Sequence, residues 1–292
     1  MAKGLKAFRS ADGIHWSPLD EKPVITKGDF DSQNLAFWHP IEKRYLDFHR
    51  KFHDGVRDIM TCGSTDFVNW TEPRFLDYGA APREHLYTNA IQPYFRAPHL
   101  LLGFPTRFQP KHEQVEPILM TSRDGLRFHR WPEPLIPITA PADRDGNRSN
   151  YMTWGLLELP GHDRELSVYA TEAYYAGPGS RVRRFTFRTD GFVSIHAGRA
   201  AGTVITRPLT FTGKQLSLNY LTSAAGKVLV EIQDNAGTAL PGWTLADCAP
   251  LTGDGFDQPV KWSGGELESL AGKAIRLRFV VLDADLFSLR FF

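Results

Sequence analysis

The stretch Ser64-Thr-Asp-Phe-Val-Asn-Trp70 decides the fold, because the chain carries this pattern three times. An earlier copy is Ser10-Ala-Asp-Gly-Ile-His-Trp16, and a later one is Ser122-Arg-Asp-Gly-Leu-Arg-Phe128. Each copy has Ser, then Asp two residues on and an aromatic ring six residues on, and the copies are 54 and 58 residues apart (64 − 10 and 122 − 64). Such a period is typical of propeller blades. Ser and Asp side chains bond their own backbone in turns and Gly permits a positive φ, so the motif predicts a repeated tight turn that a ring holds against a sheet.

Length and composition fit a folded protein that has no general affinity for polyanions. The chain has 292 residues, enough for two domains or one large all-β unit, and 42% of them are hydrophobic. The net charge of +1 gives no reason to expect nucleic acid or a membrane as partner. No apolar run approaches the ~20 residues of a membrane span. The first residues show basic charge but no apolar segment, so no signal peptide is visible and the localisation stays open.

Short strand-like runs separated by Pro, Gly and Asp fill the first 190 residues, and no useful helical period interrupts them. The expected strands are residues 5–9, 34–38, 45–52, 57–62, 87–94, 99–104, 116–120, 151–157, 165–170 and 181–188. They form three full repeats plus one orphan strand, whereas a closed propeller needs at least four blades. We therefore expect residues 1–190 to be an incomplete five-bladed propeller, truncated at its N-terminus, whose open face is available for self-association.

The sequence pattern changes at Asp190-Gly191, because the repeated turn does not recur after this point. Residues 191–292 predict a C-terminal β-sandwich with short alternating strands. Its expected strands are 216–220, 227–233 and 275–281, with turns at Thr212-Gly213, Ala225-Gly226 and 235–237. The apolar residues at alternate positions of 287–292 place the tail in a sheet, and residues 266–271 are the one candidate helix. The predicted class is all-β.

The repeated turn, followed each time by proline, resembles the blades of the five-bladed propeller glycosidases of families 43 and 32. Residues 190–194, 216–220 and 283–287 further resemble a bacterial group of propeller-plus-sandwich proteins that carry a glycosidase-like label. The resemblance implies that an Asp and a Glu flank the scissile bond, with a further Asp that tunes the acid. In those families the acids lie on the innermost strands of successive blades, and the first acid belongs to the first blade. This chain lacks that blade, which leaves open whether the set of carboxylates is complete.

Three carboxylates are the catalytic candidates. Asp31, near Asp29, precedes an expected innermost strand, and Glu84 stands in the same place one repeat later. Glu172 follows an apolar strand among aromatic residues, where burial raises a carboxyl pKa as a general acid requires. The alternatives are a solvated turn, a surface loop and a solvent-facing strand end. The equivalent loop of the third repeat holds Asp143, Asp145, Arg148 and Asn150.

Two arginines follow second strands of their repeats, Arg50 and Arg107. Converging guanidinium groups would bind a carboxylate or sulfate of a substrate in bidentate fashion. They could equally pair with Asp31 and Glu84 as structural bridges, and the sequence does not decide between the two. The further substrate-binding candidates are Asn34, His85, Tyr87 and Trp154.

Neither a metal ion nor a cofactor is expected. His49 and His53 would stand ~13 Å apart in a strand, too far for one ion. Cys62 and Cys248 form no Cys-x-x-Cys pair, and two free thiols are favoured over one disulfide.

The predicted function is that of a glycoside hydrolase-like protein, which cleaves a glycosidic bond by carboxylate acid–base catalysis at the propeller axis. Carbohydrate is the expected partner. The alternative is a non-catalytic carbohydrate-binding or scaffold protein. A catalytic pair of carboxyl groups would lie ~5–5.5 Å apart in a retaining enzyme or ~6.5–9.5 Å apart in an inverting one. The sequence indicates neither the sugar nor the linkage.

Overall fold

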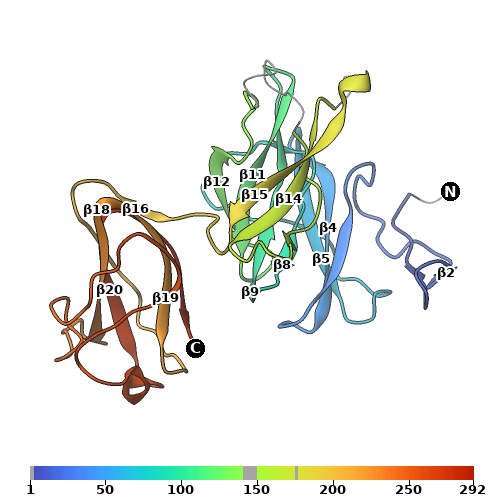
Figure 1. Ribbon diagram of the computed structural model, residues 1–292. Coiled ribbons are helices and arrows are strands. Elements are labelled where there is room, and N and C mark those ends of the chain that lie inside the picture. Colours follow the sequence, from blue (N-terminus) through green and yellow to red (C-terminus); the bar gives the residue numbers. More distant parts are fainter. Residues whose placement is uncertain (1–2, 141–149, 175–176) are drawn as a thin grey trace. The chain divides into compact units, whose positions relative to one another are not determined.

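The computed structural model describes residues 3–140, 150–174 and 177–292 (Figure 1). Within these ranges the chain is built from β-strands, and the helices are two single 3₁₀ turns, Gly177–Gly179 and Leu267–Leu270. The all-β prediction is confirmed. None of the described helices is long and apolar enough to cross a membrane. Contacts divide the chain into two compact units: unit 1 is residues 1–157 with 167–185, and unit 2 is residues 158–166 with 186–292. The boundary at residue 190 and the number of blades stay predictions.

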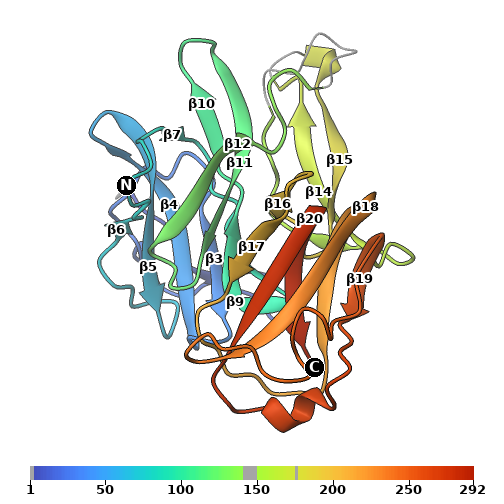
Figure 2. The same cartoon turned by 90° about the vertical axis from the view of Figure 1, so that its left-hand side faces the viewer.

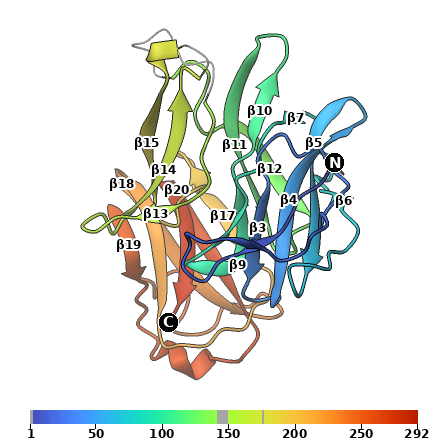
Figure 3. The ribbon, with the colours of Figure 1, turned by 90° about the vertical axis from the view of Figure 1, so that its right-hand side faces the viewer.

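Unit 1 contains two antiparallel meanders of the same design (Figure 3). The first has the strand order β3 (Leu35–His39), β4 (Arg44–His53), β5 (Val56–Ser64) and β6 (Arg74–Phe75). The second has the order β8 (Gln92–Tyr94), β9 (Ala97–Gly103), β11 (Gln114–Ser122) and β12 (Phe128–Pro134). In both, the third strand ends on the Ser that opens the repeated turn, and the fourth strand follows the turn. The sequence repeat is therefore a structural repeat.

The remaining strands before residue 190 differ from the expectation in three places. The first strand is not single, because β1 (Phe8–Arg9) pairs with β2 (Ser17–Pro18). The strand expected at 87–94 is reduced to its last three residues, β8. β7 (His85–Leu86) lies before it and pairs with β10 (Thr106–Gln109), a strand that the sequence pattern did not indicate. The strand expected at 151–157 is reduced to its last residue in β13 (Leu157–Glu158), which joins β14 (Glu165–Glu172) and β15 (Arg181–Arg188) in a three-stranded sheet.

The three repeated turns share one hydrogen-bonding pattern, as predicted. In each, the Ser hydroxyl accepts the amide three residues on and the Asp carboxylate accepts the amides two and three residues on. The Ser bonds are Gly13 N to Ser10 Oγ at 2.8 Å, Phe67 N to Ser64 Oγ at 2.9 Å and Gly125 N to Ser122 Oγ at 3.0 Å. The burial of the aromatic residue that ends each copy differs between copies. Phe128 is 2% exposed, whereas Trp16 is 61% exposed and does not hold its turn in a core.

The second turn accepts a bulky residue where the other two have glycine. Phe67 has φ 66°, beside 76° at Gly13 and 70° at Gly125. A residue with a side chain is strained in this region by about 1–3 kcal/mol. The Phe67 ring lies edge-on to Tyr45 at 4.9 Å and to Trp70 at 5.4 Å between centroids, contacts that offset part of this strain.

Residues on both faces of β4 are buried, unlike those of a strand that has one face in solvent. On one face, Leu46 and Phe48 pack with Ile59, Leu86 and residues of the second meander in a common hydrophobic core. Because side chains alternate along a strand, Asp47 and His49 lie on the other face, and both are also buried.

Unit 2 is one five-stranded antiparallel sheet (Figure 2). Its strands are β16 (Ile195–Ala197), β17 (Gly202–Ile205), β18 (Leu216–Asp234), β19 (Asp254–Pro259) and β20 (Ile275–Phe291). The two strands expected at 216–220 and 227–233 are one, and the turn predicted at Ala225-Gly226 is wrong. The register shifts there between Thr222 and Lys227, and a Cβ on Gly226 would lie 2.2 Å from the carbonyl oxygen of Asp283. The glycine thus permits a bulge pressed against β20. The tail lies in β20, as predicted.

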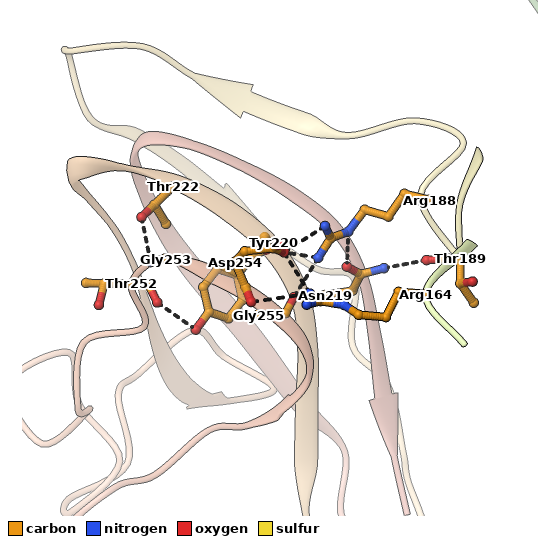
Figure 4. A network of polar contacts seen from close by, with 10 residues as sticks. All are labelled: Arg164, Arg188, Thr189, Asn219, Tyr220, Thr222, Thr252, Gly253, Asp254 and Gly255. Carbon is orange, nitrogen blue, oxygen red and sulfur yellow. Dashed lines mark hydrogen bonds and ion pairs between the residues drawn. The ribbon is translucent and has the colours of Figure 1, made fainter. Parts of the chain in front are cut away.

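A polar network within unit 2 fixes the segment around Arg188 to the sheet (Figure 4). The Arg188 guanidinium donates to Asn219 Oδ1 at 2.6 Å and to the Gly255 carbonyl at 2.9 Å, and it pairs with Asp254 at 2.7 Å. Arg164 reaches the same carboxylate at 2.8 Å. The amide of Asn219, a buried residue, donates to the Thr189 carbonyl at 2.8 Å. One planar side chain therefore satisfies acceptors on β18, on β19 and in the Asp254 side chain.

We expect Arg188→Ala to lower the stability of unit 2 by about 2–4 kcal/mol, because several acceptors lose a charged donor at once. Arg188→Lys will not restore it, since one ammonium cannot reproduce the planar fork. Hydrogen exchange of the β18 amides measures the change. Arg290→Ala is the matched control: this half-exposed arginine pairs only with Asp257, at 3.2 Å, among the acidic residues described, and should cost less than about 1 kcal/mol. Equal effects of the two alanine variants would contradict the role of Arg188.

We also expect Asp124→Ala to destabilise unit 1 by about 1–2 kcal/mol, because Leu126 N at 2.9 Å and Arg127 N at 2.7 Å lose their acceptor. Asp124→Asn should cost about half as much, since its amide oxygen still accepts. Urea unfolding checks both, with the exposed Glu133→Gln as control. A loss in Asp124→Ala no larger than in the control would mean that the turn does not depend on the carboxylate.

Candidate functional site

A pocket of about 530 Å³ opens in unit 1 beside the added pair of strands β7 and β10. The acidic and basic side chains in its lining are Arg83, Glu84, His85, Arg107, Lys111 and His112. Among the lining residues that the structure describes, Glu84 is the one acidic residue, beside two arginines and one lysine. Arg83 also pairs with Asp54 and Arg107 with Glu116, so Lys111 is the lining cation that no described carboxylate pairs with. Three predicted site residues, Glu84, His85 and Arg107, therefore share one pocket.

Glu84 lies between two arginines at the pocket wall. Its Oε1 is 3.3 Å from Arg107 Nη1 and its Oε2 is 3.1 Å from Arg130 Nη2. Arg107 also pairs with Glu116 at 2.6 Å, and Glu116 is buried. Glu84 keeps 29% of its side chain exposed, so a ligand in the pocket can still reach it. Arg107 thus joins an accessible carboxylate and a buried one.

His85 connects the pocket with β5 through a hydrogen bond to Arg57. Its Nδ1 accepts the backbone amide of Arg57 at 3.2 Å, so the proton of the neutral ring is on Nε2, which can donate to a ligand. Burial, and then the nearby Arg57 charge, lower the pKa of His85 below 6.5. The Arg57 guanidinium also lies over the Tyr87 ring, 4.5 Å from its centroid. The imidazole is therefore held neutral at the pH of most cells.

Asp31 and Arg50 are joined to the pocket residues through the Tyr87 ring. Arg50 Nη2 is 2.6 Å from Asp31 Oδ1, and the Arg50 guanidinium lies 5.7 Å from the centroid of Tyr87. Arg50 is 8% exposed at its side chain, whereas Asp31 is 76% exposed. Asp31 does not line the pocket. The geometry shows the pairing of Arg50 with Asp31 and of Arg107 with Glu84, and substrate binding by either arginine stays a prediction.

Glu172, Asn34 and Trp154 are not among the pocket-lining residues. Glu172 is 1% exposed and contacts Arg181 at 2.8 Å and Arg183 at 2.5 Å. The Asn34 amide donates to the Phe30 and Ser32 carbonyls, and the half-exposed Trp154 donates its indole N–H to the Ile91 carbonyl at 2.9 Å. Asp143, Asp145 and Arg148 lie outside the described residues. Catalytic roles for Asp31, Glu84 and Glu172 stay predictions.

Sequence reasoning missed Glu116, Arg130 and Arg57, which connect the predicted residues. A usable signal was present at Glu116, which interrupts the apolar run of β11, whereas the burial of Arg130 in β12 is known only from the structure. Buried charges are rare unless they are paired. Glu84 also differs from its expected place, because it precedes β7 and not the first strand of the second meander.

A second polar cluster, Asp47, His49 and Cys62, is buried away from the pocket lining and could hold a metal ion. His53 is not part of this cluster: it contacts Asp58 at 3.1 Å, and its ring stacks on that of Phe75 at 3.9 Å between centroids. Both cysteines are free and buried, as predicted.

No protein-family model matches this sequence, and no relative among curated proteins is found. Solved structures that resemble the chain include glycoside hydrolases of the two families named above. The family 32 β-fructofuranosidase BmSUC1 of Bombyx mori is 9% identical over 98% of this chain and 72% of its own, with a TM-score of 0.41. The family 43 arabinoxylan arabinofuranohydrolase of Bacillus subtilis, in complex with cellotetraose, is 11% identical over 94% and 71%, with a TM-score of 0.39.

A third similar structure is that of a BT0996 RGII complex, at 15% identity and a TM-score of 0.41. It matches 59% of this chain and 52% of its own length, so the chain spans about half of that protein.

We expect His85 to titrate with a midpoint below 6.5, because burial and the Arg57 charge both disfavour the imidazolium. The stability that this neutral ring contributes is complete above pH 6.5 and is lost as the pH falls through its lowered pKa. Ring-proton NMR during a pH titration measures the midpoint. Arg57→Met, which removes the charge but keeps the backbone amide, should raise it. A midpoint at or above 6.5 in the unmodified protein would contradict the described environment.

Proposed function

We propose that the chain is a glycoside hydrolase-like protein whose sugar site is the pocket lined by Glu84, His85 and Arg107. The observation that carries the proposal is that these three residues, selected as candidates from the sequence, line one pocket of about 530 Å³. A pocket of this volume accommodates one to a few sugar rings. Tyr87 and Phe108, whose rings lie 5.2 Å apart, provide aromatic surface close to it.

The charge of the lining points to a sugar that carries an anionic group, such as a uronate or a sulfate ester. Among the described lining residues Arg83, Lys111 and Arg107 outnumber the carboxylate of Glu84, and no described acid pairs with Lys111. Arg107, a lining residue, keeps its buried Nε–H group without a hydrogen-bond partner in the described structure. Buried donors of this kind gain when a ligand oxygen arrives.

Hydrolysis would use Glu84 as the accessible carboxylate and neutral His85 as a donor to a sugar hydroxyl. Glycoside hydrolysis also needs a second carboxyl group. Asp31 is the exposed candidate, and Glu116 is the buried one behind Arg107. A specific observation favours a second candidate function, binding without hydrolysis: within residues 3–140, 150–174 and 177–292, Glu84 is the one acid that lines the pocket.

We expect oligosaccharides of uronic acids or sulfated sugars to raise the melting temperature of the full chain more than their neutral counterparts do. Lys111→Ala should weaken binding about 5- to 10-fold, which is about 1–1.4 kcal/mol. Lys261→Ala, an exposed lysine of unit 2, is the control and should bind as the unmodified protein does. No stabilisation by any anionic sugar, or equal binding by both lysine variants, would contradict the assignment of the pocket.

Glu84→Gln separates catalysis from binding, because the amide keeps the shape of the side chain and loses the charge. If the protein is a hydrolase, release of reducing ends from a bound substrate should fall by at least about 100-fold while the variant still binds. Binding without turnover in the unmodified protein would assign the pocket to recognition alone.

A further inference from the structure

The buried cluster of Asp47, His49 and Cys62 lies on the face of β4 and β5 that is opposite the hydrophobic core. Asp47 and His49 alternate along β4 and therefore share a face, and Cys62 pairs with Asp47 directly across the two strands. Their exposures are 1%, 0% and 5%. One carboxylate oxygen, one ring nitrogen and one sulfur atom of the cluster all lie within 4.8 Å of one another. The strand register thus brings three different metal-ligating groups to one point.

The orientation of His49 is fixed from the side opposite the cluster. Its Nε2 lies 2.9 Å from the Lys27 carbonyl oxygen, which can only accept, so Nε2 carries a proton and Nδ1 faces Asp47. The chain after Lys27 presses on the ring: a Cβ on Gly28 would lie 2.6 Å from His49 Cδ2, and the Phe30 ring is 5.3 Å away. A histidine whose distal N–H is held by a backbone carbonyl is the arrangement that ligating histidines adopt.

We propose that Asp47, His49 and Cys62 form a buried binding site for a single zinc ion. Cys62 Sγ lies 3.8 Å from Asp47 Oδ1, close to the ~3.5 Å that separates two ligands of one tetrahedral zinc ion. Asp47 and His49 are in direct hydrogen-bond contact, so their ligand atoms separate by about 1 Å when the ion replaces the proton between them.

The charge of the occupied site is the second argument. A divalent ion with one carboxylate and one thiolate is neutral, so its burial avoids the cost of an uncompensated charge. Zinc binding displaces the thiol proton of Cys62 and the proton shared by Asp47 and His49, and the ion takes their place. Zinc needs no redox partner for this exchange.

The test uses the full chain, unfolded in guanidinium with a reductant and refolded with Zn²⁺ or with a chelator, because the ligand atoms are buried in the folded protein. We expect about one equivalent of zinc per chain after desalting and a melting temperature at least about 5 °C above that of the chelator-treated protein. Refolding with Co²⁺ in place of zinc should give thiolate-to-metal charge-transfer absorption in the near ultraviolet.

Cys248→Ser is the matched control, because Cys248 is equally buried and free but is not part of the cluster. It should keep the zinc, the shift and the cobalt band, whereas Cys62→Ser should retain roughly a tenth of an equivalent or less. Failure of Cys62→Ser to fold would leave the decision to the cobalt band of the unmodified protein and of Cys248→Ser. No retained zinc and no cobalt band in the folded protein, or zinc bound equally by Cys62→Ser, would overturn the proposal.

Discussion

The architecture of unit 1 depends on a carboxylate that bonds two successive backbone amides at the end of a strand. In the second and third copies of the turn, this bond occurs directly after the third strand of a meander, and the fourth strand follows it. The turn reverses the chain without needing a core of its own, because Ser and Asp satisfy the amide groups that the sharp bend leaves unpaired. Identical bonding in the second copy, despite Phe67 at a positive φ, shows that the polar contacts dominate over local backbone preference.

A series of alternating cations, rings and carboxylates spans the ends of several strands in unit 1. Asp31, Arg50 and Tyr87 form one end of it, and Arg57 with His85 leads on to the pocket. Such a series has two consequences. Each guanidinium is held in place by packing and by charge, which prepares the pocket for a ligand before it binds. The same contacts make the arginines difficult to alter without loss of structure, because removal of one partner leaves a buried charge unpaired.

The sequence was sufficient for the features that local chemistry dictates and insufficient for those that pairing between distant strands creates. The Ser–Asp turns, β4, β5 and β15 follow from alternation and turn residues. The burial and ion pairing of Glu172 could not be predicted in the same way. Its two arginine partners lie on the neighbouring strand, and strand register is set by the whole sheet. Glu84 likewise lies away from the expected first strand, because β7, which follows it, pairs with β10, and this pairing between distant strands could not be predicted. A glycine such as Gly226 is typical of a turn and equally typical of a place where two backbones approach closely. Which of the two occurs depends on the partner strand β20, which the local sequence does not reveal.

The order of strands in unit 2 has a consequence for how this part of the chain comes to exist. β20 pairs with β16, β17 and β18, all of which precede it in the sequence. The strand in the middle of the sheet is therefore the last of the five to leave the ribosome. Until β20 has emerged, β16 and β17 have no partner, and β18, a strand of nineteen residues, exposes one edge to other chains. During synthesis these edges stay unpaired until the last strand is made, while the meanders of unit 1, whose paired strands are close in the chain, can close as they are made.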